Sequence, residues 1–122
     1  MGAMQHSVLI VDDHAGFRAS ARRLLEADGY EVVGEAADGR AAIAAAQRLR
    51  PDVVLLDVNL PDADGFHVAA ELMAGSAAHR PAVLLTSSHD REDFGESLST
   101  SSAAAFVPKD QLSGAVVAAL VA

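Results

Sequence analysis

Near the middle of the chain, four apolar residues run directly into a carboxylate: Val53-Val54-Leu55-Leu56-Asp57. Continuous hydrophobicity over so short a run is typical of a strand that is buried on both faces, as in a parallel sheet. Asp57 then stands at the carboxyl end of the strand. In folds that alternate strands with helices, ligands bind beyond that end. The run therefore predicts a central strand of a sheet, and it predicts that the functional site lies at the carboxyl ends of the strands.

Four similar runs flank this one, and segments with helical periodicity separate them. The other predicted strands are Ser7–Val11, Glu31–Glu35, Ala82–Leu85 and Ala104–Val107. The predicted helices are a segment from about Phe17 to a stop at Gly29, Asp38–Leu49, Gly65–Ala74, Arg91–Ser102 and Gln111–Val121. Five strands alternating with five helices predict a doubly wound α/β fold, with a parallel sheet covered on both faces. The pattern does not fix the strand order; we expect the common order 2-1-3-4-5.

Several helix details follow from residue type. Asp38 and Asp64 are expected to cap the helices that they precede, and Asp62 is interpreted as a turn or cap residue. Arg91–Ser102 is rich in Ser and Thr, which disfavour helix interiors, so we expect a short, labile helix there. The inward faces of the third and last helices are predicted to comprise Phe66, Ala69, Ala70 and Met73, and Leu112, Ala115, Val116, Ala119 and Leu120.

Polar residues follow four of the five predicted strands. Asp12 and Asp13 follow the first strand, Asp57 the third, Thr86 the fourth, and Lys109 comes just after the fifth. With the order 2-1-3-4-5, these four strands are consecutive neighbours, so we expect the five side chains to converge on one crevice.

The chemistry of such a crevice is restrictive. Three carboxylates within a few ångströms raise one another's pKa unless a cation compensates, and Lys109 supplies only one charge. Mg²⁺ is the natural complement, because it prefers oxygen ligands. A carboxylate beside Mg²⁺, an ammonium and a Thr hydroxyl is equipped for phosphoryl transfer. Asp57 is the best nucleophile candidate, because it stands alone while Asp12 and Asp13 form a pair suited to the metal.

Composition narrows the function further. The 122 residues fit one domain, predicted at 5–122, after a leader at 1–4 that we interpret as a cloning remnant. A net charge of −8 argues against nucleic-acid binding by this segment, and the lack of Cys excludes disulfides and thiolate metal sites. No apolar run reaches the ~20 residues of a membrane helix. We therefore expect a cytoplasmic protein without membrane contact.

Five motifs together are similar to the signature of bacterial two-component response regulators, specifically their receiver domains. They are Val8-Leu9-Ile10-Val11-Asp12-Asp13, Leu55-Leu56-Asp57-Val58-Asn59-Leu60-Pro61, Asp64-Gly65, Leu85-Thr86-Ser87 and Phe106-Val107-Pro108-Lys109. The resemblance covers essentially the whole chain after the leader. It implies a flavodoxin-like fold and a signalling switch in place of an enzyme, one that assists its own phosphorylation and dephosphorylation.

The resemblance also implies roles for single residues. Asp57 would accept a phosphoryl group from a sensor histidine kinase, with Mg²⁺ held by Asp12, Asp13, Asp57 and the Asn59 backbone carbonyl. Lys109 and Thr86 would contact the phosphoryl oxygens. Thr86 and Phe106 would form the switch pair that changes a protein-interaction surface and can promote a homodimer.

Two features depart from the commonest family pattern: Phe106 stands where Tyr is common, and Pro108 precedes Lys109. The segment 11–18 resembles receivers that carry a downstream helix-turn-helix domain, which implies control of transcription and DNA contact only through that domain. A single-domain receiver and an unphosphorylated pseudo-receiver stay open as alternatives. A phosphohydrolase is disfavoured because Asn59 stands where such enzymes need a second acid. The five His residues are interpreted as surface or loop residues, with His14 and His89 bordering the crevice.

Overall fold

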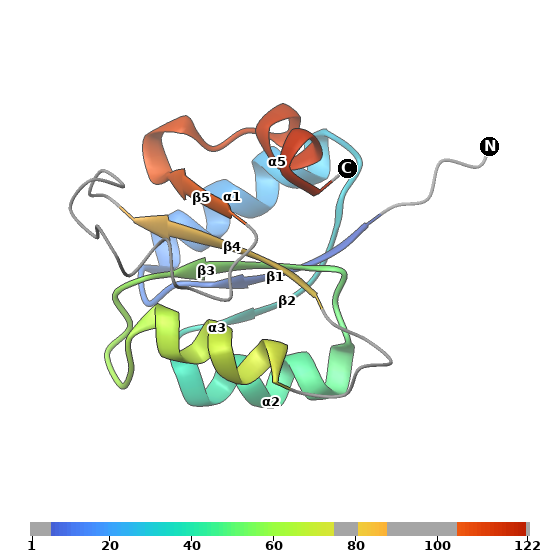
Figure 1. Cartoon of the computed structure of the whole chain (residues 1–122). Helices are drawn as coiled ribbons and strands as arrows, with labels where there is room; N and C mark the ends of the chain where they lie inside the picture. The colour runs from blue at the N-terminus through green and yellow to red at the C-terminus, as the bar shows by residue number, and fades with distance from the viewer. Residues whose placement is uncertain (1–5, 75–80, 88–104, 122) are drawn as a thin grey trace.

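The computed structural model describes residues 6–74, 81–87 and 105–121, and it contains one five-stranded parallel sheet (Figure 1). The strand order is β2-β1-β3-β4-β5, which confirms the expected order. The strands are β1 Ser7–Val11, β2 Glu31–Ala36, β3 Val53–Asp57, β4 Ala82–Ser87 and β5 Ala105–Pro108. β2, β3 and β4 each extend one or two residues beyond their predicted ends, so the polar residues Asp57, Thr86 and Ser87 belong to strands.

Helices cover both faces of the sheet, as predicted. In Figure 1, α1 and α5 lie on one face and α2 and α3 on the other. The helices are α1 Ala15–Ala27, α2 Gly39–Leu49, α3 Gly65–Met73 and α5 Gly114–Val121, and a 3₁₀ turn, η2, spans Lys109–Gln111. The predicted helix at Arg91–Ser102 lies outside the described residues.

Two apolar cores arise because successive side chains of a strand point to opposite faces. Leu9, Val54 and Leu56 lie in the core under α2 and α3, where Val68 and Leu72 pack on them. The core under α1 and α5 consists of Val8, Ile10, Ala21, Leu25, Tyr30, Val32, Val53, Leu55, Leu84 and Val117. β3 is buried along its entire length, which explains its unbroken hydrophobic run.

The predicted helix caps are present. The Asp38 carboxylate accepts a hydrogen bond from the Ala41 amide at 2.7 Å, and the Asp64 carboxylate accepts one from the His67 amide at 3.1 Å. Each satisfies an amide in the first helical turn that has no partner within the helix.

Two predicted helix faces need correction. Ala70 of α3 is exposed, and Val68, Ala69 and Leu72 form the buried face. α5 begins at Gly114, three residues later than predicted, because η2 intervenes and the Ser113 hydroxyl accepts a hydrogen bond from the Val116 amide as a cap. Its buried positions among the described residues are therefore Gly114 and Val117, whereas the predicted inward residues Ala115, Ala119 and Leu120 are exposed.

Candidate functional site

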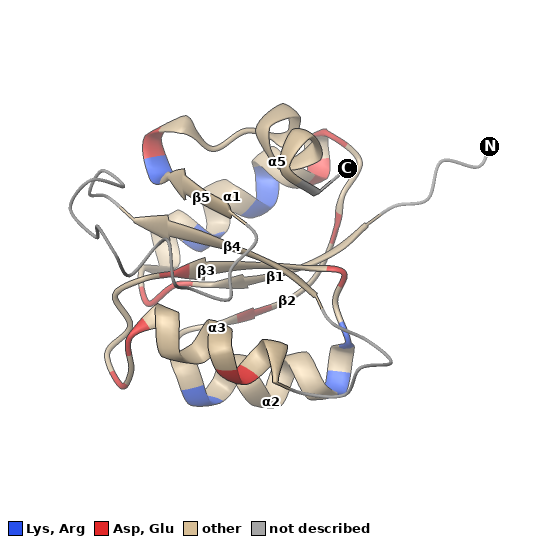
Figure 2. Cartoon of the chain, in the orientation of Figure 1, with Lys and Arg blue, Asp and Glu red and all other residues tan. Residues whose placement is uncertain are grey.

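A cluster of acidic side chains, Asp12, Asp13 and Asp57, lies where β1 and β3 end, and we call it the acidic crevice. Figure 2 shows acidic positions gathered at this edge. Lys109 follows β5 and places its Nζ 2.6 Å from Asp12 Oδ2 and 3.5 Å from Asp57 Oδ2. Asp12 is fully buried and Asp57 is 3% exposed. The predicted convergence of these three residues is therefore seen, and a single ammonium bridges two buried carboxylates.

Asp13 and His14 complete the rim of the crevice. The Asp13 side chain is partly exposed, and His14 Nδ1 lies 3.1 Å from both Asp13 Oδ1 and Asp12 Oδ1. Asp12, Asp13, His14 and Asp57 each offer one ligand atom, and these atoms all lie within 4.8 Å of one another. The sequence prediction included the three carboxylates and placed His14 as a surface or loop residue bordering the crevice, as the structure shows, but it did not include His14 among the metal ligands.

Opposing effects act on the pKa of the Asp57 carboxyl group. Burial raises its pKa, as does the charge of Asp12, whereas the Asn59 amide and the Lys109 ammonium lower it, and the net effect is a raised pKa. Loss of hydration disfavours the charged form of a carboxyl group. A bound cation would shift this balance toward the carboxylate.

The backbone around Asp57 is held on three sides. The Asn59 amide donates to Asp57 Oδ1 at 3.1 Å, and the Val58 amide donates to the Thr86 carbonyl at 2.9 Å. The Gly65 amide, at the start of α3, donates to the Val58 carbonyl at 2.6 Å. A Cβ at Gly65 would lie only 2.5 Å from the Asp57 carbonyl oxygen, so the close approach of α3 requires glycine.

Thr86 and Phe106 lie on neighbouring strands beside the crevice. Thr86 is level with Asp57 on β3 and with Val107 on β5. It is fully buried, and its Oγ1 has no hydrogen-bond partner in the described part of the chain. Phe106 is partly buried and packs against the core under α2 and α3. A buried hydroxyl without a partner is costly, so Thr86 is the position where a further polar ligand would be accommodated.

Sequence reasoning missed two residues that support the crevice. The Phe17 ring lies 4.6 Å from Lys109 Nζ, a cation–π contact that holds the ammonium from the α1 side. The Arg18 guanidinium donates to the Asp12 carbonyl and, through Nε, to Glu35 Oε1 at 3.0 Å. Helical periodicity placed Phe17 on the apolar face and Arg18 in solvent. The contacts of Phe17 with Lys109 and of Arg18 with Glu35 join distant segments, and the contact of Arg18 with Asp12 reaches the loop after β1. Helical periodicity predicts none of these contacts.

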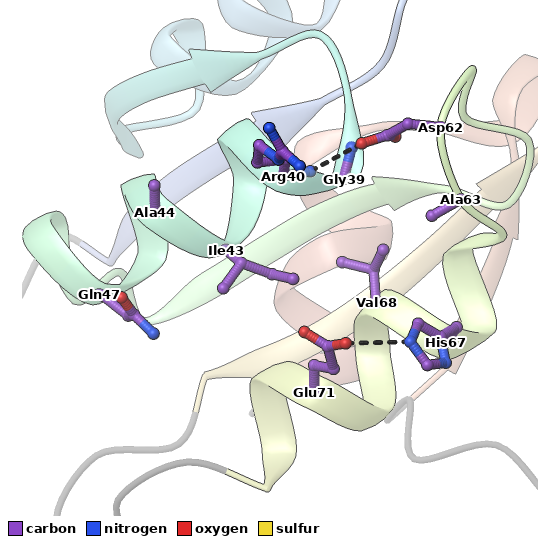
Figure 3. A pocket seen from close by; sticks show the side chains of 10 residues that line it. All are labelled: Gly39, Arg40, Ile43, Ala44, Gln47, Asp62, Ala63, His67, Val68 and Glu71. Carbon is purple, nitrogen blue, oxygen red and sulfur yellow. Dashed lines mark hydrogen bonds and ion pairs between the residues drawn. The ribbon is translucent and has the colours of Figure 1, made fainter.

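A second, open depression of about 520 Å³ lies between α2 and α3, away from the acidic crevice (Figure 3). At its rim, Asp62 accepts hydrogen bonds from the Gly39 and Arg40 amides at 2.7 and 3.0 Å. Asp62 is thus a cap residue, as predicted, but it caps α2 from a distant loop. His67 and Glu71 form an ion pair of 2.9 Å on α3.

Residues 8–121 match the family model of the response regulator receiver domain. The chain therefore belongs to this family of signal receivers. It is 34% identical to the signal receiver domain of a NarL response regulator from Mycobacterium tuberculosis, with a TM-score of 0.84 and coverage of 97% of this chain and 98% of that one. The CheX–CheY–BeF3–Mg complex from Borrelia burgdorferi contains a similar chain, with 25% identity, a TM-score of 0.80 and coverage of 95% and 86%.

Curated relatives are longer and differ in output. A protein-glutamate methylesterase/protein-glutamine glutaminase from Alkalilimnicola ehrlichii is 40% identical over 87% of this chain and 27% of its own length. The transcriptional regulatory protein PdtaR from Mycobacterium tuberculosis is 39% identical over 74% of this chain and 43% of its own length. This chain thus spans less than half the length of these two relatives. Among the described helices, none is long and apolar enough to cross a membrane.

Proposed function

We propose that this receiver domain is a Mg²⁺-dependent phosphoacceptor switch, and that Asp57 is the residue that becomes phosphorylated. The observation that carries the proposal is the Lys109 ammonium, which bridges the buried carboxylates of Asp57 and Asp12. Asp57 is the only one of the three crevice carboxylates that belongs to a strand, and its other oxygen is fixed by the Asn59 amide.

The residues present fit a divalent cation. Three carboxylates face one ammonium, which leaves an excess of negative charge, and the ligand atoms of Asp12, Asp13 and Asp57 lie within 4.8 Å of one another. Those three carboxylates, with the Asn59 backbone carbonyl, would hold Mg²⁺. The bound ion supplies charge neutralisation for the transferring oxygens. The similar CheY chain forms a complex that contains BeF3 and Mg, which supports this assignment.

The chain's own groups then have definite tasks. Asp57 Oδ attacks the phosphorus of a histidine kinase's phosphohistidine, so an O–P bond forms while the P–N bond breaks and its electron pair returns to the imidazole. Lys109 stays beside the phosphoryl oxygens, and Phe17 holds it there. The Thr86 hydroxyl, which lacks a partner, donates to a phosphoryl oxygen, and Phe106 turns toward the space that Thr86 leaves.

The output is proposed to lie in a further domain of a longer protein. The relative PdtaR is a transcriptional regulator, so we propose that phosphorylation controls transcription through a downstream DNA-binding domain, with dimerisation of the receiver as an intermediate step. A segment similar to this chain also occurs in the methylesterase relative, so a different output is the alternative. The net charge of −8 argues against DNA contact by the receiver itself.

The test is phosphorylation of the purified chain by a small acyl phosphate, with and without Mg²⁺, followed by intact mass. We expect the wild type to gain one phosphoryl group only with Mg²⁺, and the Asp57→Asn variant to gain none. Asp52→Asn is the matched control, because Asp52 is an exposed carboxylate before the opposite end of β3 and should leave the gain unchanged. An absence of any gain in the wild type would instead favour an unphosphorylated pseudo-receiver.

A further inference from the structure

We propose that the acidic crevice also binds a borderline divalent transition metal of the Co²⁺ or Zn²⁺ class, with the His14 imidazole as a nitrogen ligand. The inference rests on the proposed function, because it concerns the same metal site. It assigns to His14 a role in metal selectivity, beyond the set of oxygen ligands that Mg²⁺ would use.

The first support is the position of the imidazole. His14 Nδ1 lies 3.1 Å from Asp12 Oδ1 and 3.1 Å from Asp13 Oδ1. Neighbouring ligand atoms of a four- or six-coordinate divalent ion are separated by about 3.0–3.4 Å at metal–ligand distances of about 2.0–2.1 Å. His14 Nδ1 therefore lies from each of these two carboxylate oxygens at the spacing that one shared cation would impose, which is also the length of its hydrogen bond with Asp12 Oδ1.

The second support is that His14 is anchored while its ring stays accessible. Its own amide donates to Asp12 Oδ1 at 2.8 Å, and the residue occupies the N-cap position of α1 in an extended conformation. The side chain is nevertheless 71% exposed. A cation can thus reach the ring from solvent. Because the residue is already anchored, cation binding costs little additional side-chain entropy.

The third support is the charge of the crevice. Asp12 is fully buried, and its Oδ2 lies 2.6 Å from the Lys109 ammonium, which Asp57 shares at 3.5 Å. Three carboxylates against one ammonium leave an excess of two negative charges if all three are ionised. A dication balances this excess.

Ligand chemistry then selects the metal class. Mg²⁺ is a hard ion that takes oxygen ligands and keeps several waters, so it gains little from an imidazole. Co²⁺ and Zn²⁺ bind imidazole nitrogen well, and at sites with both nitrogen and oxygen ligands their affinity is generally higher than that of harder divalent ions. His14 should therefore raise the affinity for Co²⁺ or Zn²⁺ selectively. Because Asp12, Asp13 and Asp57 are shared, the two classes of metal should exclude each other.

The experiment compares the whole 122-residue chain with His14→Gln and a matched control, His67→Gln. His67 is also an exposed histidine beside a carboxylate, Glu71, but it lies on α3 outside the cluster. Co²⁺ binding is followed by visible absorption and Mg²⁺ binding by calorimetry, both at pH 7.5. In addition, the histidine ¹⁵N resonances of the wild type are recorded with Zn²⁺.

We expect His14→Gln to weaken Co²⁺ binding at least about tenfold, since even outer-shell partners of a metal site contribute that much. Its Mg²⁺ affinity should stay within about twofold of the wild type. His67→Gln should change neither, excess Mg²⁺ should displace Co²⁺, and one Nδ1 resonance should shift with Zn²⁺ in the wild type but not in His14→Gln.

Three results would overturn the inference, and they separate it from the proposed function. Unchanged Co²⁺ affinity in His14→Gln, with Mg²⁺-dependent phosphorylation intact, refutes the His14 ligand alone. Equal weakening of Co²⁺ and Mg²⁺ binding assigns His14 a purely structural role. A wild type that binds neither metal and is not phosphorylated refutes both proposals.

Discussion

Replacing Lys109 with Met should destabilise the metal-free protein, because it leaves two buried carboxylates without their cation. At an effective dielectric constant of 20, ion pairs of 2.6 and 3.5 Å correspond to attractions of about 6 and 5 kcal/mol. Much of this offsets the cost of removing the charges from water. Losing one partner of a buried pair typically costs about 3–5 kcal/mol. The exposed fraction of Lys109, 15%, places the expected loss near the lower end, at about 3 kcal/mol.

The assay is urea unfolding at pH 7.5 in the presence of a chelator, with the free energy of unfolding obtained by linear extrapolation. The double variant Lys109→Met/Asp12→Asn separates the charge effect from lost packing, since it removes one of the two uncompensated carboxylates, the one nearer to Lys109, and should recover about 2 kcal/mol. Added Mg²⁺ should also restore part of the loss in the single variant. A single variant within about 0.5 kcal/mol of the wild type, or a double variant that recovers nothing, would refute this electrostatic account.

Three further predictions concern the loops and caps around the site. Gly65→Ala should lower the free energy of unfolding by about 1–3 kcal/mol and slow phosphorylation, because the new Cβ displaces the Asp57 peptide; Gly16→Ala is the control, since its Cβ would meet nothing within 4 Å. The Gly39 and Arg40 amides lower the pKa of Asp62, so its contribution to stability should be fully present above pH ~4 and disappear as the pH falls through its lowered folded-state pKa. The difference in urea midpoint between wild type and Asp62→Asn should accordingly be smaller at pH 3 than at pH 7, and an equal difference at both would contradict this. Asp38→Ala should cost about 1 kcal/mol in the same unfolding assay through loss of the α2 cap, and no loss would show that Asp62 caps the helix alone.

The sequence predicted the strands well for a physical reason, whereas their order was expected only because 2-1-3-4-5 is common among such folds. A strand buried on both faces must be apolar along its length, so the run at Val53–Leu56 could hardly be anything else. The convergence of Asp12, Asp57 and Lys109 followed in turn from the strand order, because residues at adjacent strand ends are neighbours whatever the loops do.

Other features could not be predicted because they depend on contacts between distant segments. α5 begins late because η2 and the Ser113 cap precede it, and the hydrophobic pattern of an Ala-rich helix does not mark such a start. The roles of Phe17 and Arg18 depend on where η2 and β2 place Lys109 and Glu35. The hydrogen bond between Asp62 and α2 joins residues more than twenty positions apart. The sequence could therefore predict that Asp62 caps a helix, but not that the helix is α2.

The fully buried Thr86 hydroxyl, with no partner in the described structure, has a consequence for protein engineering. Val has nearly the same shape as Thr and needs no hydrogen bond, so Thr86→Val removes the desolvation cost of that hydroxyl. If this hydroxyl contacts the phosphoryl group as proposed, thermostability and signalling place opposite demands on residue 86. A selection for heat resistance alone would favour an apolar residue at this position, and it would yield stable receivers without the hydroxyl that is proposed to contact the phosphoryl group.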